Sequence, residues 1–361
     1  MERERSIEAL SLFFTAGVAA GSATAGLHSG LSATLLLSLI ALPLLFREKI
    51  RLIAPKTATS IILCLFLLLG MLCSFLSSFP APIESGPLSD VAREAAQRLA
   101  RFIGAIPFRH DGTAPLLTAL LTGAREGLSP EMTAVFRNSG ASHLLALSGL
   151  HMGILYLILD KCSKPLGKSR AATLLRYGLL LSGAGFFTLM TGASPSIVRA
   201  FLFITIGETM RLLHRPRNGA HVLCLALLVQ LALNPQAIRS LGFQLSYLAL
   251  AGIFLLFPLL ESWYPGKGSW NPFRLIWQAS ALSISCQVFT APLIWYRFRT
   301  FPHFFLLTNL LAIPLTTALM GTAVVTLILC ALGVEAGILI RLTDTLCQGL
   351  VRILDIIASL S

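Results

Sequence analysis

The chain has 361 residues, of which 55% are hydrophobic and 12% charged, with a mean hydropathy of +0.78 and a formal net charge of +12. A soluble domain of this length needs far more charge on its surface, so this composition excludes an ordinary soluble enzyme or binding module. The positive charge suggests nucleic-acid binding, but cytoplasmic loops of membrane proteins carry a similar excess. We therefore predict an all-α polytopic integral membrane protein.

Apolar runs of the length needed to cross a bilayer recur along the whole chain, and about 10 to 11 of them are predicted transmembrane helices. In order, they are residues 7–27, 31–46, 57–79, 143–160, 173–191, 197–213, 219–233, 241–260, 275–296, 303–330 and 335–358. The first two form a predicted helical hairpin, since Gly17-xxx-Gly21 and Gly26-xxx-Gly30 would let helices pack closely. The first run has no convincing cleavage site, so we expect it to be retained.

Positive charges are distributed unevenly between the loops that join these runs. With the N-terminus in the cytoplasm, fifteen Lys and Arg residues fall in the cytoplasmic segments and four in the short outer segments, the long segment 80–142 not being counted. The fifteen are Arg3, Arg5, Arg47, Lys49, Arg51, Lys56, Lys161, Lys164, Lys168, Arg170, Arg211, Arg215, Arg217, Lys267 and Arg274, and the four are Arg199, Arg239, Arg297 and Arg299. Because cytoplasmic loops are enriched in Lys and Arg, this asymmetry predicts a cytoplasmic N-terminus.

The segment from residue 80 to residue 142 is less apolar than the runs on either side of it. In this orientation it is on the outer side of the membrane. Residues 85–106 are a predicted amphipathic helix, started by a serine, that suits the outer membrane surface. Residues 115–121 are apolar but too short to span, which indicates a re-entrant or interfacial segment. A short helix follows, announced by Ser129 and ended at Gly140.

The most unusual stretch runs from His143 to His151, with the sequence His-Leu-Leu-Ala-Leu-Ser-Gly-Leu-His, inside an apolar run. Polar side chains are rarely kept at such depth without a use. On a single helix, the two histidines would lie about 80° apart and flank one broad face. Gly149 and Gly153 would leave that helix bare enough for another helix to approach closely. The combination predicts a packed site.

Each of these polar residues also has a simpler interpretation. A histidine in a protein interior is more often a hydrogen-bonded structural group than a ligand. Ser148 is expected to return a hydrogen bond to its own helix at Leu144. The seven cysteines stand alone within or at the edges of apolar runs, so we expect packing residues and neither a disulfide framework nor a metal site.

Three further segments carry polar or helix-breaking residues within apolar runs. They are Gly192–Ala200, with Pro195 and Arg199, then Leu241–Ala249, with Gln244, and finally Gln287–Pro314, with Asn309. Together with the histidine stretch, and in this order, they resemble the transmembrane competence domain of the ComEC family, the inner-membrane DNA channel of bacterial natural transformation. The resemblance runs from about Leu116 to Met320 and includes Leu-Leu-Thr-Gly, ending at Gly123, and Phe-Arg-Asn-Ser-Gly, ending at Gly140.

The resemblance implies a channel in the bacterial cytoplasmic membrane that passes one strand of incoming DNA into the cytoplasm. The implied partners are single-stranded DNA and the lipid bilayer, with a separate DNA receptor, nuclease and cytoplasmic motor. Whether the protein forms a homo-oligomer is left open by the resemblance. The predicted organisation is residues 1–79 as N-terminal transmembrane helices, 80–142 as an extracytoplasmic amphipathic and re-entrant segment, and 143–361 as the channel core.

Full-length members of the ComEC family commonly add an extracellular OB-like domain and a C-terminal metallo-β-lactamase-like domain. Only about 35 residues separate Phe79 from Pro115, and no His-x-His-x-Asp-His motif occurs in the sequence. We therefore expect this chain to lack both domains and to be no enzyme, with no catalytic residue, metal or cofactor.

Nine residues are candidates for the DNA path: His143, Ser148, Gly149, His151, Pro195, Arg199, Gln244, Gln287 and Asn309. A charge at the bilayer centre is costly, so a strand of phosphates needs a wet path with cations or donors along it. Arg199 is the best candidate, because it follows Pro195, which opens a backbone carbonyl in a helix. Its alternative is a side chain that snorkels to the outer interface. The three amides would line a pore or tie helices together equally well.

Two other function classes stay open. An intramembrane hydrolase would use Ser148 with a histidine, but no Asp or Glu is positioned to orient the imidazole. A small-solute or proton-coupled transporter would relay protons through the two histidines and Glu208, but no inverted halves are detectable. We expect Glu208 to pair instead with a nearby cation, Arg211 or Arg215.

Overall fold

The computed structural model describes residues 2–24, 55–77, 86–167, 169–216, 218–264, 271–299, 301–334 and 336–360. Within these ranges the chain forms α-helices joined by turns and short 3-10 segments, and it forms no strand. Three stretches are long and apolar enough to cross a membrane: Arg170–Met190, Leu241–Ser262 and Phe305–Ala331. The all-α fold class is confirmed, and these stretches fit a membrane protein. The predicted run 31–46 and the Gly26-xxx-Gly30 pair lie outside the described residues.

The described chain divides into two compact units. Unit 1 takes the described parts of residues 1–84 and 201–244, and unit 2 takes those of residues 85–200 and 245–361. This division follows contacts between helices, whereas the three segments predicted from the sequence follow membrane topology and stay a prediction.

Unit 1 is a small group of helices: α1 (Glu2–Thr24), α4 (Pro55–Leu76), α12 (Gly219–Leu233) and the 3-10 helix η2 (Pro235–Arg239). Helix α1 packs against α4, α12 and η2. A side chain on Gly17 would collide with the backbone carbonyl of Leu67, and one on Gly70 with that of Phe14. Gly17 is thus a point of close helix packing, with α4 as its neighbour among the described residues, while the predicted hairpin with residues 31–46 stays a prediction.

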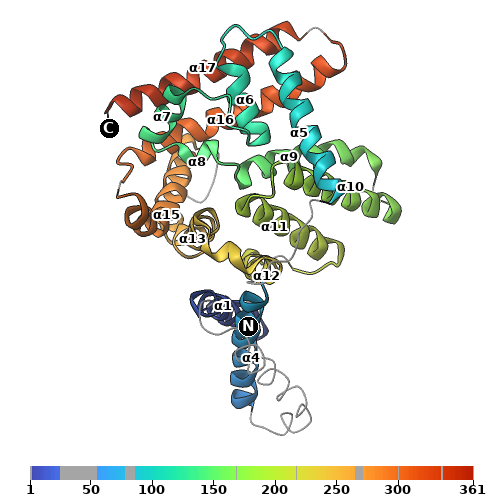
Figure 1. Ribbon diagram of the computed structural model, residues 1–361, viewed down its shortest axis with the longest axis vertical. Coiled ribbons are helices and arrows are strands. Elements are labelled where there is room, and N and C mark those ends of the chain that lie inside the picture. The colour runs from blue at the N-terminus through green and yellow to red at the C-terminus, as the bar shows by residue number, and fades with distance from the viewer. Residues whose placement is uncertain are drawn as a thin grey trace. The chain divides into compact units, whose positions relative to one another are not determined.

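Unit 2 contains most of the other helices: α5 (Pro87–Ala105), α6 (Thr113–Thr122), α7 (Pro130–Asn138), α8 (Ser142–Leu145), α9 (Gly149–Ser163), η1 (Lys164–Leu166), α10 (Arg170–Met190), α14 (Phe257–Ser262), α15 (Pro272–Phe298), α16 (Phe305–Ala331) and α17 (Gly337–Leu360). Helix α11 (Pro195–Leu212) begins in unit 2 and continues into unit 1, and α13 (Leu241–Leu255) does the reverse. Within unit 2, α16 and α17 lie side by side, with α6 and α7 against them (Figure 1).

Helices α16 and α17 run antiparallel and carry the core of unit 2. Thr326 Oγ1 on α16 lies 3.1 Å from Thr343 Oγ1 on α17. Towards the N-terminal end of α16, Thr308 Oγ1 donates a hydrogen bond to the carbonyl oxygen of Ser139, just after α7, at 2.8 Å. Towards the other end of α16, the buried Asp344 carboxylate on α17 accepts hydrogen bonds from the chain before and at the start of α6.

Two side chains donate to Asp344, Thr113 Oγ1 at 2.5 Å and His110 Nδ1 at 2.7 Å, and the Arg109 backbone N–H donates as well. Thr308 and Thr326 lie eighteen residues apart on α16, which corresponds to about 27 Å of helix. The segment 110–139 is therefore hydrogen-bonded to the α16–α17 pair at two points that lie most of the length of α16 apart.

Helix α6, within this segment, is largely enclosed by protein. Seven of its ten residues are buried: Thr113, Leu116, Leu117, Ala119, Leu120, Leu121 and Thr122. A short apolar segment is tolerated at membrane depth only when protein or a wet cavity surrounds it. The burial of α6 supports the interpretation of residues 115–121 as re-entrant, which stays a prediction.

The two helices predicted between residues 80 and 142 are both present. Helix α7 begins as predicted, since the Ser129 side chain caps it by accepting a hydrogen bond from the backbone N–H of Met132 at 3.1 Å. Gly140 follows its end with a φ of +77°, a left-handed conformation that glycine adopts without strain. Helix α5 starts at Pro87, and its N-cap is Gly86 in place of the predicted serine.

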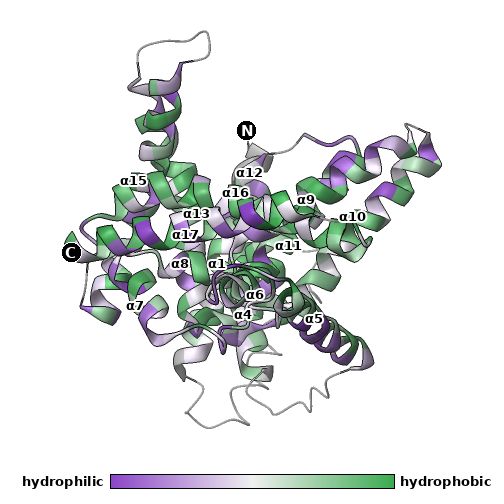
Figure 2. Cartoon of the chain, turned by 90° about the horizontal axis from the view of Figure 1, so that it is seen from above, coloured by the Kyte–Doolittle hydropathy of each residue, from purple (hydrophilic) through white to green (hydrophobic). Residues whose placement is uncertain are grey.

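The amphipathic character of α5 is visible in Figure 2, where hydrophilic residues are prominent along the helix. Its apolar residues divide into two groups. Ile103 is fully buried against the rest of unit 2, whereas Leu88 and Val91 near the N-terminal end are 61% and 55% exposed. Exposed apolar residues on a charged helix are typical of a segment that lies at a membrane surface.

The predicted orientation can be tested by labelling single cysteines in a cysteine-free background. Ser89 lies on α5, and Ser169 lies in a loop that carries cytoplasmic-type charge. An impermeant thiol reagent applied to intact cells should label Ser89→Cys and miss Ser169→Cys, whereas permeabilised cells should label both. Labelling of Ser169→Cys alone in intact cells would reverse the orientation.

Candidate functional site

The apolar run from residue 143 to residue 160 is broken into two helices. Helix α8 ends at Leu145, Ala146 and Ser148 are extended, and α9 begins at Gly149. The prediction that His143 and His151 flank one face of a single helix is therefore wrong. The physical reason is the serine, whose hydroxyl satisfies the free N–H groups of a new helix start better than it serves a helix interior.

Ser148 caps α9 together with His151. Its Oγ accepts a hydrogen bond from the Leu150 N–H at 3.3 Å, and His151 Nδ1 accepts one from the Ser148 N–H at 3.2 Å, which forms a reciprocal capping box. The expected bond from Ser148 back to Leu144 is thus wrong. Because Nδ1 accepts, the ring proton is assigned to Nε2. That Nε2 is buried and has no hydrogen-bond partner among the described residues.

Arg199 lies in the first turns of α11, with its side chain packed inside unit 2. The residue is 9% exposed, and its Nη1 has no hydrogen-bond partner among the described residues. Its guanidinium carbon lies 5.8 Å from the centre of the Tyr247 ring on α13. A Cβ placed on Gly149 would lie 3.8 Å from Arg199 Nη2. The guanidinium therefore lies between the start of α9 and the face of an aromatic ring, and it does not snorkel to the surface of unit 2.

The charge of Arg199 has no counter-ion in the described part of the chain, where no Asp or Glu forms a salt bridge with it. Removing a charge from water costs several kcal/mol even after relaxation, whereas a cation–π contact returns about 0.5–2 kcal/mol. The N-terminus of α9 adds about half a positive charge close by. Two positive groups packed together with no anion make a site that is complementary to an anion such as a phosphate.

Pro195 and the two glycines have roles that differ from those predicted. Pro195 is the first residue of α11, where its missing N–H costs nothing, so it opens no carbonyl inside a helix. A Cβ on Gly149 would meet only Arg199 and Ala200 at ordinary contact distances, and one on Gly153 would meet nothing within 4 Å. The predicted close approach of another helix backbone at these glycines is therefore wrong.

The remaining predicted residues lie apart from the Arg199 site or have no measured link to it. His143 is exposed, with Nδ1 3.2 Å from the Gly140 carbonyl oxygen. Gln244 belongs to unit 1 and donates from Nε2 to the Ile238 carbonyl at 2.8 Å, as a helix tie. Gln287 Nε2 on α15 is buried without a partner among the described residues. Asn309 on α16 is half-buried.

Tyr247 is the residue of this site that the sequence reasoning missed. It lies in the Leu241–Ala249 stretch, three residues after Gln244, and is not among the nine predicted path residues. An aromatic side chain in a polar-marked segment was the available signal, since aromatic faces are the neutral partners of buried cations.

Comparison with known proteins covers the part of the chain that contains Gly149, Arg199 and Tyr247. The family described as "Competence protein" matches residues 120–361, which is more than half of the chain. The chain belongs to this family. The resemblance to the ComEC transmembrane competence domain is thereby confirmed, and Gly149, Arg199 and Tyr247 all lie inside the matched part of this competence protein.

Several curated proteins are similar to parts of this competence protein. "ComE operon protein 3" of Bacillus subtilis is 28% identical over 223 residues, which cover 62% of this chain and 27% of the relative. "Competence protein ComA" of Neisseria gonorrhoeae is 30% identical over 207 residues, which cover 55% and 28%. "Uncharacterized protein YcaI" of Escherichia coli is 26% identical over 220 residues, which cover 56% and 27%. The similarity thus spans little more than a quarter of each relative, and no solved structure matches.

Proposed function

We propose that this competence protein passes single-stranded DNA through the bacterial cytoplasmic membrane during natural transformation, with Arg199 at a phosphate contact on the path. The observation that carries the proposal is the buried guanidinium, with Nη1 unpartnered in the described chain, beside the start of α9. Every nucleotide of a strand presents a phosphate whatever its base, so one such contact serves any sequence. Membership of the competence family favours DNA as the source of the anion.

A single phosphate contact of this kind suits the passage of a DNA strand better than its tight, lasting binding. A conducting site must bind well enough to admit its cargo and weakly enough to release it. Arg199 offers two donors on one planar group, and the neutral His151 Nε2–H is a further unpartnered donor near the start of the same helix α9. A single cation holds one phosphate against α9, and the next phosphate along the strand replaces it with the same contacts. Each step therefore exchanges equivalent interactions.

Two features argue against the alternative functions. For a proton-coupled transporter, Glu208 would have to exchange protons, but its carboxylate pairs with Arg211 at 3.1 Å. For a hydrolase, Ser148 Oγ does lie 3.1 Å from His151 Nδ1, but that nitrogen already accepts the Ser148 backbone N–H. No carboxylate among the described residues orients the ring through Nε2. Proton abstraction from the serine is therefore poorly supported.

The wider setting is part of the same proposal. We place the protein in the cytoplasmic membrane with its N-terminus inside, and we assign strand degradation, DNA capture and energy supply to a separate nuclease, receptor and motor. This chain would supply binding and passage without covalent chemistry.

The test is complementation in the source organism. Deletion of the gene should abolish transformation and the entry of labelled DNA into the cytoplasm, while labelled DNA still binds the cell surface. The parent chain supplied in trans should restore both. A deletion strain that transforms like its parent would contradict the proposal, and so would a loss of surface binding that accounts for the whole defect.

A further inference from the structure

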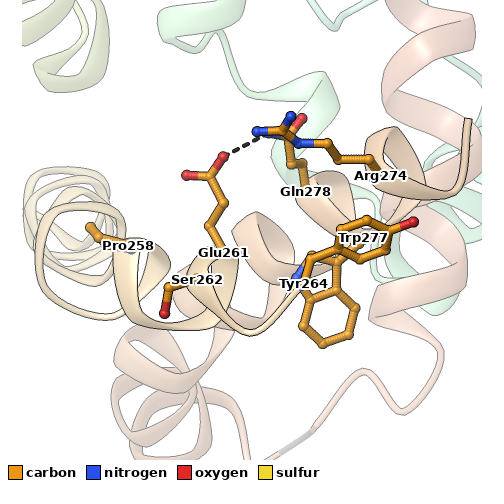
Figure 3. A pocket seen from close by; sticks show the side chains of 7 residues that line it. All are labelled: Pro258, Glu261, Ser262, Tyr264, Arg274, Trp277 and Gln278. Atoms are coloured by element: carbon orange, nitrogen blue, oxygen red, sulfur yellow. Dashed lines mark hydrogen bonds between the residues drawn. The ribbon is translucent and has the colours of Figure 1, made fainter. Parts of the chain in front are cut away.

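A cavity of about 300 Å³ lies between α14 and α15 in unit 2, away from the histidine stretch in sequence. Its walls include Glu261, Tyr264, Arg274, Trp277 and Gln278 (Figure 3). The volume is at the lower end of the range for small-ligand sites. It accommodates one nucleotide unit more readily than a larger molecule.

The two aromatic rings of the cavity are held in place by hydrogen bonds to their polar ends. Trp277 Nε1 donates to the Leu260 carbonyl at 3.0 Å. The Tyr264 hydroxyl accepts from Asn271 Nδ2 at 3.0 Å. Both bonds involve only the polar ends of the rings and fix the orientation of rings that line the cavity, so binding against them needs little further ordering.

The polar wall contains one cation that the described chain leaves unpaired. Gln278 Nε2 donates to Glu261 Oε1 at 2.6 Å, the interaction drawn as a dashed line in Figure 3. Arg274 lies one turn before Gln278 on the same face of α15. No salt bridge joins Arg274 to Glu261 or to another carboxylate in the described ranges. The guanidinium is therefore available to an anion that enters the cavity.

We infer that this cavity binds one nucleotide of a single DNA strand, with the base against Trp277 or Tyr264 and the phosphate on Arg274. The inference rests on the proposed function and extends it to a second contact on the strand. Aromatic faces beside a basic residue are the common means of binding single strands without regard to sequence, because every base has a flat face. The charge asymmetry of the loops assigns the turn that carries Arg274 to the cytoplasmic side, where the strand would leave the membrane.

The test uses the purified full chain in lipid nanodiscs and a fluorescent 12-nucleotide single strand, with binding followed by anisotropy. Trp277→Ala should weaken binding about tenfold, and Trp277→Phe, which keeps a ring, should restore most of it. Arg274→Ala should weaken binding and lower the slope of log affinity against log salt by about 0.7, the value for one lost phosphate contact. Trp263→Ala is the matched control, since Trp263 is 63% exposed and does not line the cavity.

The variants and a second probe separate the outcomes. Arg274→Ala breaks no hydrogen bond of its own side chain in the described structure, so it tests the inference even if Trp277→Ala fails to fold. Parent-like binding by Arg274→Ala and by a folded Trp277→Ala would overturn the inference. If deoxyadenosine monophosphate competes as strongly as the unlabelled strand, the cavity serves free nucleotides, and the assignment to a strand is wrong.

The same variants keep this inference distinct from the proposed function. If Arg199 variants block transformation while the cavity variants bind the strand normally, only the cavity inference fails. If the cavity variants lose binding while the gene proves dispensable for DNA entry, only the passage function fails.

Discussion

Replacing Arg199 by alanine is expected to lower transformation frequency by about 30-fold or more, because truncating one partner of a buried charge pair costs about 2–5 kcal/mol. Protein level and membrane insertion should be unchanged or slightly improved, since the substitution removes a buried cation that has no counter-ion in the described chain. This combination of lost function with retained stability distinguishes a phosphate contact from a structural role.

Two further substitutions at Arg199 separate charge from geometry. Arg199→Lys keeps the charge but loses the planar fork that binds two phosphate oxygens, so its defect should be milder than that of alanine. Arg199→Gln keeps donors without charge and should resemble alanine. Arg352→Ala on α17 is a suitable control, because Arg352 is exposed. Equal transformation frequencies for all Arg199 variants, normalised to membrane-resident protein, would remove Arg199 from the path.

Replacing Gly149 by alanine should impair passage without damaging the fold. The new methyl group would lie 3.8 Å from Arg199 Nη2 and 3.9 Å from Ala200 Cβ, which are ordinary contacts, so no rearrangement is needed. It would nevertheless occupy the space between the start of α9 and the guanidinium, where a phosphate would make both contacts. We expect a loss of about tenfold or more in transformation frequency, by the same reasoning as for a lost charge contact.

Gly153→Ala is the matched control for this prediction. It makes the same chemical change on the same helix, at a position where a Cβ meets nothing within 4 Å. Both alanine substitutions should leave the free energy of unfolding unchanged or raise it by up to about 1 kcal/mol, because alanine favours the helix over glycine. A Gly149→Ala variant that transforms as well as Gly153→Ala would show that no anion passes between α9 and Arg199.

Sequence alone determined the features that depend on near neighbours in the chain. The start of α7 followed from Ser129, because a capping hydroxyl acts on N–H groups two or three residues away. Helix α10 covers Arg170–Met190, close to the predicted run 173–191, because an apolar run of that length has few other ways to satisfy its backbone in a membrane. The family also followed from sequence, since order and spacing of motifs survive where pairwise identity is below about a third.

The close contact at Gly17 was predictable in kind but not in partner. A pair of glycines four residues apart shows that some helix approaches, because small side chains allow backbones to meet. Which helix does so depends on how several apolar surfaces pack, and the structure answers with α4.

Only the tertiary structure decided what the histidine stretch and Arg199 do. A serine favours a helix start, but inside an apolar run it also occurs in helix interiors, bonded to its own helix, and the packing around Ser148 selects the helix start. The burial of Arg199 and its position between Gly149 and Tyr247 join residues about 50 positions apart in each direction along the chain. Such contacts arise from the packing of three helices and leave no local signal in the sequence. The sequence therefore shows only a cation in an apolar region. The candidate anion site follows from the fold.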